Sequence, residues 1–139
     1  VTTRNQVLSS GNLLRTAALA YVMVLSLIVA TAWAFGTPLI ELVSSNQFSS
    51  HGGDLWLIWL GLSFSGLGHL LVLKGQSYGR LQVYILPKFI QFALLLVSLL
   101  MLIEPMGLTG AAIALSISGA GYLLAIIVVN VRLTPAISK

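Results

Sequence analysis

Four long apolar segments, each nearly free of charge, constrain the fold of this chain more than any other feature. They cover residues 13–35, 55–73, 81–103 and 107–131. A helix that crosses the hydrocarbon core of a bilayer needs roughly 17–25 mostly apolar residues, and the shortest segment reaches about 28 Å at a helical rise of about 1.5 Å per residue. Backbone amides cannot stay unpaired in lipid, and no segment alternates as a barrel strand does. The sequence therefore predicts an all-α membrane protein with four transmembrane helices in a single region, residues 1–139.

The composition excludes an ordinary soluble domain. Asp, Glu, Lys and Arg make up 7% of the residues, against roughly a quarter in soluble domains, which need charge to cover their surface. The basic residues form no cluster long enough to follow a phosphate backbone, so no nucleic acid partner is expected. The chain has no cysteine, and His51 and His69 flank opposite ends of one apolar segment. We therefore expect no metal site and no cofactor.

The charged residues predict the orientation in the membrane. With four crossings, all seven basic residues fall on one side: Arg4, Arg15, Lys74, Arg80, Lys88, Arg132 and Lys139. The three acidic residues, Glu41, Asp54 and Glu104, fall on the other side. Lys and Arg are retained in the cytoplasm during insertion, so both termini are expected to be cytoplasmic. The predicted location is the plasma membrane, which is the inner membrane of a bacterium.

The connections predict how neighbouring helices are joined. Gly36-Thr37-Pro38 should bend or end the first helix, because Pro38 lacks an N–H and clashes with the preceding turn. Asp54 is well placed to cap the second helix. Residues 104–106 are few enough to form a tight hairpin, which would make the third and fourth helices antiparallel neighbours.

The fourth segment is rich in small residues at regular spacing. Gly110, Ala114 and Ser118 recur every four positions and follow Gly107 at the start of the segment. Small residues let helix backbones approach closely in lipid, where no hydrophobic force drives helices together. We therefore predict that these four residues serve helix packing rather than chemistry.

The third segment holds a charge inside an apolar run. Tyr84, Lys88 and Gln91 are spaced i, i+4, i+7 and share one face of a helix. An intramembrane charge usually faces a bundle interior or a water-filled cavity, which predicts a cationic stripe for an anionic group such as phosphate. In the alternative interpretation, Lys88 extends its long stem back to the nearby membrane surface. The sequence leaves both open.

The second segment contains a serine and a histidine at a spacing that allows a nucleophile and base pair. Ser65 and His69 are i, i+4 and could form a hydrogen bond, as a serine nucleophile and its base do. Intramembrane serine proteases require Gly-x-Ser-Gly, whereas residues 63–66 are Ser-Phe-Ser-Gly, and no acidic residue lies at membrane depth to orient the imidazole. The sequence therefore predicts no enzymatic activity.

One stretch resembles a known family of transporters. Residues 103–114, IEPMGLTGAAIA, are similar to an element of oligosaccharide and polysaccharide flippases, in which a short turn carries Gly-x-x-Gly-Ala-Ala into the next helix. These flippases belong to the multidrug/oligosaccharidyl-lipid/polysaccharide exporter superfamily. Residues 36–40 also resemble the kinked end of an earlier helix in that family, followed by a hairpin into residues 56–60.

The resemblance implies a fold and a function. Such flippases have two six-helix lobes, and this chain would match the last four helices of the second lobe. The resemblance then implies that the chain is a fragment of a transporter that moves lipid-linked oligosaccharide across the membrane by alternating access. Its partners would be membrane lipid, that substrate and the missing N-terminal helices of the same transporter. Lys88 is the cavity residue to which the resemblance extends, and Gln91 and Tyr84 would line the path beside it. The alternative function is a non-transporting membrane scaffold or assembly subunit, which would expose its small-residue stripe to another protein.

Overall fold

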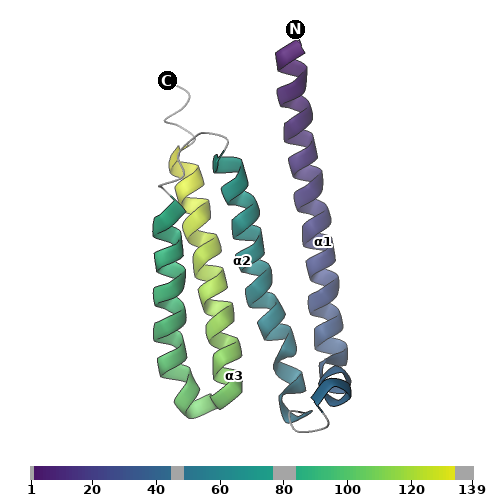
Figure 1. Ribbon diagram of the computed structural model, residues 1–139, viewed down its shortest axis with the longest axis vertical. Helices are drawn as coiled ribbons and strands as arrows, with labels where there is room; N and C mark the ends of the chain where they lie inside the picture. Colours follow the sequence, from purple (N-terminus) through teal and green to yellow (C-terminus); the bar gives the residue numbers. More distant parts are fainter. Residues whose placement is uncertain (1, 45–48, 77–83, 134–139) are drawn as a thin grey trace.

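The computed structural model describes residues 2–44, 49–76 and 84–133, and every regular element in these ranges is helical (Figure 1). Helix α1 comprises Thr2–Ser44, a short 3₁₀ helix η1 comprises Ser49–Asp54, α2 comprises Leu55–Gln76 and α3 comprises Ile85–Leu133. In these ranges three helices are long and apolar enough to cross a membrane, over Arg15–Val43, His51–Leu73 and Ile85–Arg132. The prediction of an all-helical membrane protein is confirmed at this level.

Helix α3 contains the third and fourth predicted segments, because the chain reverses direction inside it. Gly107 has φ +55° and ψ −128°, a backbone conformation that is not helical and that favours glycine. Figure 1 shows the result, two antiparallel helical arms that lie side by side. We call residues 85–106 the first arm and residues 108–133 the second arm. The reversal is at Gly107, whereas residues 104–106, the predicted hairpin, remain helical.

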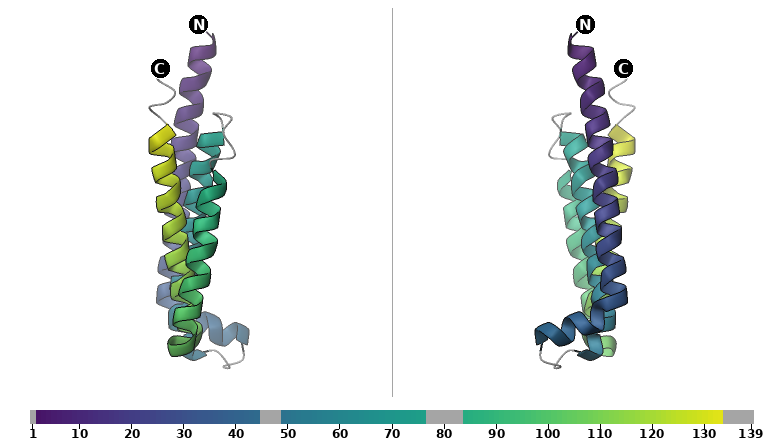
Figure 2. Two further views of the ribbon diagram at one scale, coloured as in Figure 1. Left: turned by 90° about the vertical axis from the view of Figure 1, so that its left-hand side faces the viewer. Right: turned by 90° about the vertical axis from the view of Figure 1, so that its right-hand side faces the viewer.

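Helix α1 is longer than the predicted segment and changes direction near its end. Pro38 lies inside the helix, which continues to Ser44. Figure 2 shows the last turns of α1 running sideways from the foot of the bundle, as expected where a proline removes a backbone hydrogen bond. The helix therefore bends at this point rather than ending.

Other predicted boundaries agree or lie outside the described ranges. Helix α2 begins at Leu55, directly after Asp54, and extends to Gln76, three residues past the predicted end. The predicted start of the third helix, residue 81, lies outside the described residues, as do the basic residues Arg80 and Lys139.

The core lies between α2 and the two arms of α3. Tyr84, Tyr122 and Ile126 form the buried cluster, at 5%, 1% and 0% exposure. The backbones of α2 and the second arm nearly touch, since a Cβ on Gly119 would lie 2.3 Å from the carbonyl oxygen of Gly61. Helix α1 instead packs on α2 and η1, and its described residues make no close backbone approach to α3. Large apolar side chains cover the outside of all three helices, as a lipid-facing surface requires.

Candidate functional site

Tyr84, the first residue of the predicted polar stripe, is hydrogen-bonded to the second arm. Tyr84 is buried, and its hydroxyl donates a hydrogen bond of 2.8 Å to Oδ1 of Asn130 on the second arm. Nδ2 of Asn130 in turn donates to the carbonyl oxygen of Leu71 on α2, at 3.3 Å. Tyr84, directly before the first arm, therefore belongs to a link between the start of that arm, the second arm and α2.

The ammonium group of Lys88 is held by two neighbours. Its Nζ donates a hydrogen bond of 3.0 Å to Oε1 of Gln91 and lies 4.2 Å from the ring centroid of Tyr122. A cation over a tyrosine ring is attracted by the negative face of the ring. Lys88 nevertheless remains exposed over part of its length, so the group is both held by the bundle and open to its surroundings.

The depth of these contacts bears on the two interpretations of Lys88. The bond between Tyr84 and Asn130 places these two residues at the same level of the antiparallel arms. At a rise of about 1.5 Å per residue, Lys88 lies about 6 Å further into the bundle than Tyr84. By the same measure, Tyr122 lies about 12 Å further into the bundle than Asn130. Gln91 also lies deeper than Lys88. The side chain is therefore directed away from the nearer end of the first arm, opposite to the direction that reaches the membrane surface.

Gln91 connects Lys88 to helix α2. While its Oε1 accepts from Lys88, its Nε2 donates to Oγ of Ser65 at 2.9 Å. The two ends of one amide thus join a charged group on the first arm to a hydroxyl on α2. Hydrogen bonds arranged in a chain polarise and strengthen one another in a low-dielectric interior.

His69 and Ser65 do not form the nucleophile and base pair that their spacing allows. Nδ1 of His69 lies 2.7 Å from the backbone carbonyl oxygen of Ser65, and since a carbonyl only accepts, Nδ1 carries the hydrogen. The hydroxyl oxygen of Ser65 accepts a hydrogen bond from Nε2 of Gln91. The His69 ring lies 5.3 Å from that of Tyr122, centroid to centroid. We call Ser65, His69, Lys88, Gln91 and Tyr122 the polar cluster.

The four predicted packing residues differ in their surroundings. Ala114 and Ser118 are buried, at 0% and 2% exposure. Gly110 is also buried, and a Cβ there would lie 2.1 Å from the carbonyl oxygen of Leu102 on the first arm. Gly107 has open space around it and provides the backbone conformation of the reversal.

Two members of these networks, Tyr122 and Asn130, were not singled out from the sequence. The signal was present, because the spacing of Gly110, Ala114 and Ser118 continues every four residues to Tyr122, Ile126 and Asn130. On a helix with 3.6 residues per turn a spacing of four advances by about 40° at each step, so these six residues follow a spiral around the second arm. The first five of them are buried in the structure.

A second polar contact lies at the foot of the bundle. Oγ1 of Thr109 donates a hydrogen bond of 2.5 Å to Oδ2 of Asp54, and the same oxygen lies 3.6 Å from Nδ1 of His51. This contact joins the start of the second arm to the end of η1. Among the described residues, no group of three His, Asp or Glu side chains is arranged to hold a metal ion.

Comparisons of the chain with models of protein families, with curated proteins and with solved structures found no significant match.

Proposed function

We propose that this chain is the C-terminal four-helix portion of a flippase for lipid-linked oligosaccharide in a bacterial inner membrane. In this proposal α1, α2 and the two arms of α3 each cross the bilayer once, and both termini are cytoplasmic. The remaining helices of the transporter would form the opposing lobe, so that the substrate passes between the two lobes by alternating access.

The positions of the charges support this orientation. The start of α1 and the ends of α2 and α3 lie at one end of the bundle, and the reversal at Gly107 lies at the other (Figure 1). Basic residues occur toward the first end, at Arg15, Lys88 and Arg132. The acidic residues occur at the opposite end, at Glu41, Asp54 and Glu104. This separation follows the rule that cytoplasmic ends are rich in Lys and Arg.

The observation that carries the functional proposal is the direction of Lys88. A lysine at this depth can reach the surface with its stem, yet its ammonium group is turned further into the bundle, toward Gln91 and Tyr122. A charge kept at membrane depth usually serves a substrate or ion pathway. The phosphate that joins an oligosaccharide to its lipid is an anion of the kind that Lys88 would attract, with Gln91 and Tyr84 beside the path.

The alternative, a non-transporting scaffold, requires an exposed small-residue stripe. Ala114 and Ser118 on that stripe are instead buried within the chain. The stripe is therefore already occupied by the chain's own helices, which favours the transporter over the scaffold.

Export of oligosaccharide by the complete protein tests the proposal. A hydrogen bond to a charged group contributes about 1.5–3 kcal/mol, so Lys88→Ala should reduce export by about 10–150-fold. Lys88→Arg should keep much of the activity, because arginine retains the charge and also stacks on aromatic rings. Arg132→Ala is the matched control, since it removes an exposed cation at the end of α3. If Lys88→Ala exports as well as Arg132→Ala at equal protein levels, Lys88 has no role in the path.

A further inference from the structure

Hydrogen bonds join α2 to α3 at three successive levels, and a fourth bond joins the end of η1 to α3 at the foot of the bundle. From the foot upward, these bonds link Asp54 to Thr109, Leu57 to Ser116, Ser65 to Gln91 and Leu71 to Asn130. The bond from Oγ of Ser116 to the carbonyl oxygen of Leu57 is 2.7 Å long and lies beside the close approach of Gly61 to Gly119. We call α2 and the two arms of α3 the three-helix unit.

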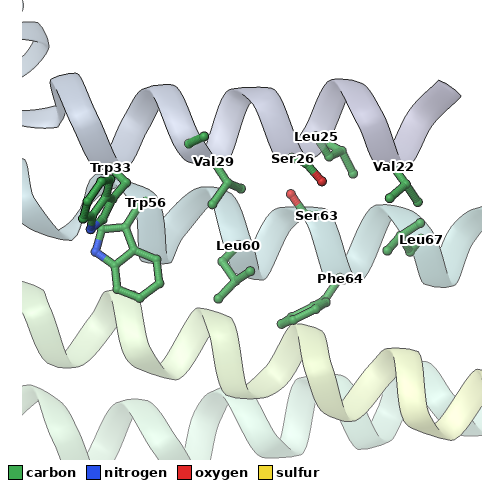
Figure 3. Close-up of a pocket in the computed structure, with 11 residues that line it drawn as sticks. Val22, Leu25, Ser26, Val29, Trp33, Trp56, Leu60, Ser63, Phe64 and Leu67 are labelled. Carbon is green, nitrogen blue, oxygen red and sulfur yellow. The ribbon is translucent and has the colours of Figure 1, made fainter. Parts of the chain in front are cut away.

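Helix α1 is attached to this unit in a different way. In the described part of α1, residues 15–39 form no hydrogen bond with another helix. The contact with α2 is made mostly by apolar side chains, together with the hydroxyl end of Tyr21, which packs directly on Gly66, and with the hydroxyls of Ser26 and Ser63, which point toward one another in Figure 3. In lipid, apolar contact alone holds helices together weakly, because lipid tails offer an equivalent surface. Residues 15–39 of α1 therefore lack the hydrogen bonds that join the other helices.

Two grooves beside the contact between α1 and α2 show that side chains fill only part of the space between the two helices. The larger groove has a volume of about 480 Å³, and Figure 3 shows it running between the two helices from Trp33 and Trp56 to Val22 and Leu67. A smaller groove of about 270 Å³ lies over Thr31, Leu39 and Trp59, among other residues. Close-packed interiors have few voids larger than a water molecule, so this contact is unlike the core of the three-helix unit.

The foot of α1 is fixed more closely. Gly36 and Gly52 are both buried, and a Cβ on Gly36 would lie 2.2 Å from the carbonyl oxygen of Gly52. A Cβ on Gly52 would likewise lie 2.4 Å from the Cα of Thr37. The backbones of α1 and η1 thus touch at this point, which is next to the bend at Pro38.

We infer that α1 swings as a rigid arm about the contact between Gly36 and Gly52, opening and closing a lateral gap toward α2 while the three-helix unit stays intact. The inference rests on the proposed membrane placement but not on the transport of oligosaccharide. Leu19 lies about 26 Å along the helix from Gly36, so a tilt of about 10° would move it by about 4 Å, well within the range of tilts found for membrane helices.

Distances between pairs of spin labels, measured by pulsed electron resonance in lipid nanodiscs, test this inference. The chain has no native cysteine, so each pair of introduced cysteines reports on its own. Leu19→Cys with Leu73→Cys measures the gap between α1 and α2, and Leu73→Cys with Leu124→Cys measures the three-helix unit. All three leucines are exposed. A third pair at the foot, Phe35→Cys with Met106→Cys, also uses exposed sites.

We expect the pair across the gap to give two maxima about 4 Å apart, or a distribution broadened by that amount, while the other two pairs each give one narrow peak. The narrow peak from Leu73 and Leu124 also shows that the labelled chain is folded.

An equally narrow distribution for Leu19 and Leu73 would mean that α1 is fixed to α2. Equal broadening of the pair at the foot would mean that α1 detaches as a whole, and broadening of the pair between Leu73 and Leu124 would mean that the three-helix unit is not rigid. Each of these three results would overturn the inference.

Discussion

Replacing Gly119 by alanine should weaken the contact between α2 and the second arm. The new Cβ would lie 2.3 Å from the carbonyl oxygen of Gly61, whereas ordinary contact begins near 3.4 Å. The helices must therefore separate by about 1 Å, a strain that typically costs about 1–3 kcal/mol. The same separation would break the 2.7 Å bond between Ser116 and Leu57, which contributes about 0.6 kcal/mol in a membrane bundle. Alanine returns about 1 kcal/mol through its higher helix propensity.

The expected net effect is a decrease of about 0.6–2.6 kcal/mol in the free energy of unfolding, measured by steric trapping in bicelles. Gly53→Ala is the matched control, because a Cβ on Gly53 would have no atom within 4 Å. That control should change the free energy by less than about 0.5 kcal/mol. A Gly119→Ala protein as stable as the Gly53→Ala protein would refute the close approach of the two helices.

Three further predictions concern single contacts and use the same unfolding measurement. Gly107→Ala should lose about 1–2 kcal/mol, because φ of +55° brings a Cβ too close to the following carbonyl; an unchanged stability would place the reversal elsewhere. Tyr84→Phe should cost about 0.6 kcal/mol by removing the donor to Asn130, and no loss would mean that water or lipid replaces that donor equally well. A double-mutant cycle of Asp54→Ala and Thr109→Val should give a coupling of about 1.5 kcal/mol or more, since the acceptor is a carboxylate; strictly additive effects would contradict the bond.

Much of the fold could be predicted because membrane helices follow a strong length rule. The apolar segments that are long enough to cross a bilayer predicted the helices. They also predicted the start of α2 at residue 55 and its end to within three residues. The small-residue spacing of the second arm identified Ala114 and Ser118, which are buried in the structure. Pro38 identified the bend in α1, because the missing N–H is a property of the residue itself.

Other features depend on contacts between segments distant in the sequence. The apolar pattern of residues 13–35 does not predict that α1 begins as early as Thr2. The hairpin was predicted at residues 104–106, whereas the reversal is at Gly107, where the backbone has a positive φ.

The contacts within the polar cluster could not be predicted from the sequence either. The spacing of Tyr84, Lys88 and Gln91 indicated one face of one helix, but it could not identify partners on the other helices. The direction of Lys88 is set by Tyr122, which lies 34 residues further along the chain. The hydroxyl oxygen of Ser65 accepts a hydrogen bond from the amide of Gln91 on the first arm, and the ring of His69 is bonded to the backbone carbonyl of Ser65. A local spacing rule contains no information on either contact.

The central claim, that the chain crosses the membrane four times with the reversal of α3 outside the cytoplasm, can be tested most directly by cysteine accessibility. Gly53→Cys, Met106→Cys and Arg132→Cys each place one thiol at an exposed site of a chain that has no other cysteine. In intact cells, a membrane-impermeant maleimide should label the first two thiols and should label the third only after the inner membrane is opened. Labelling of Gly53→Cys and Met106→Cys from opposite sides of the membrane, or of both only from the cell interior, would contradict the account.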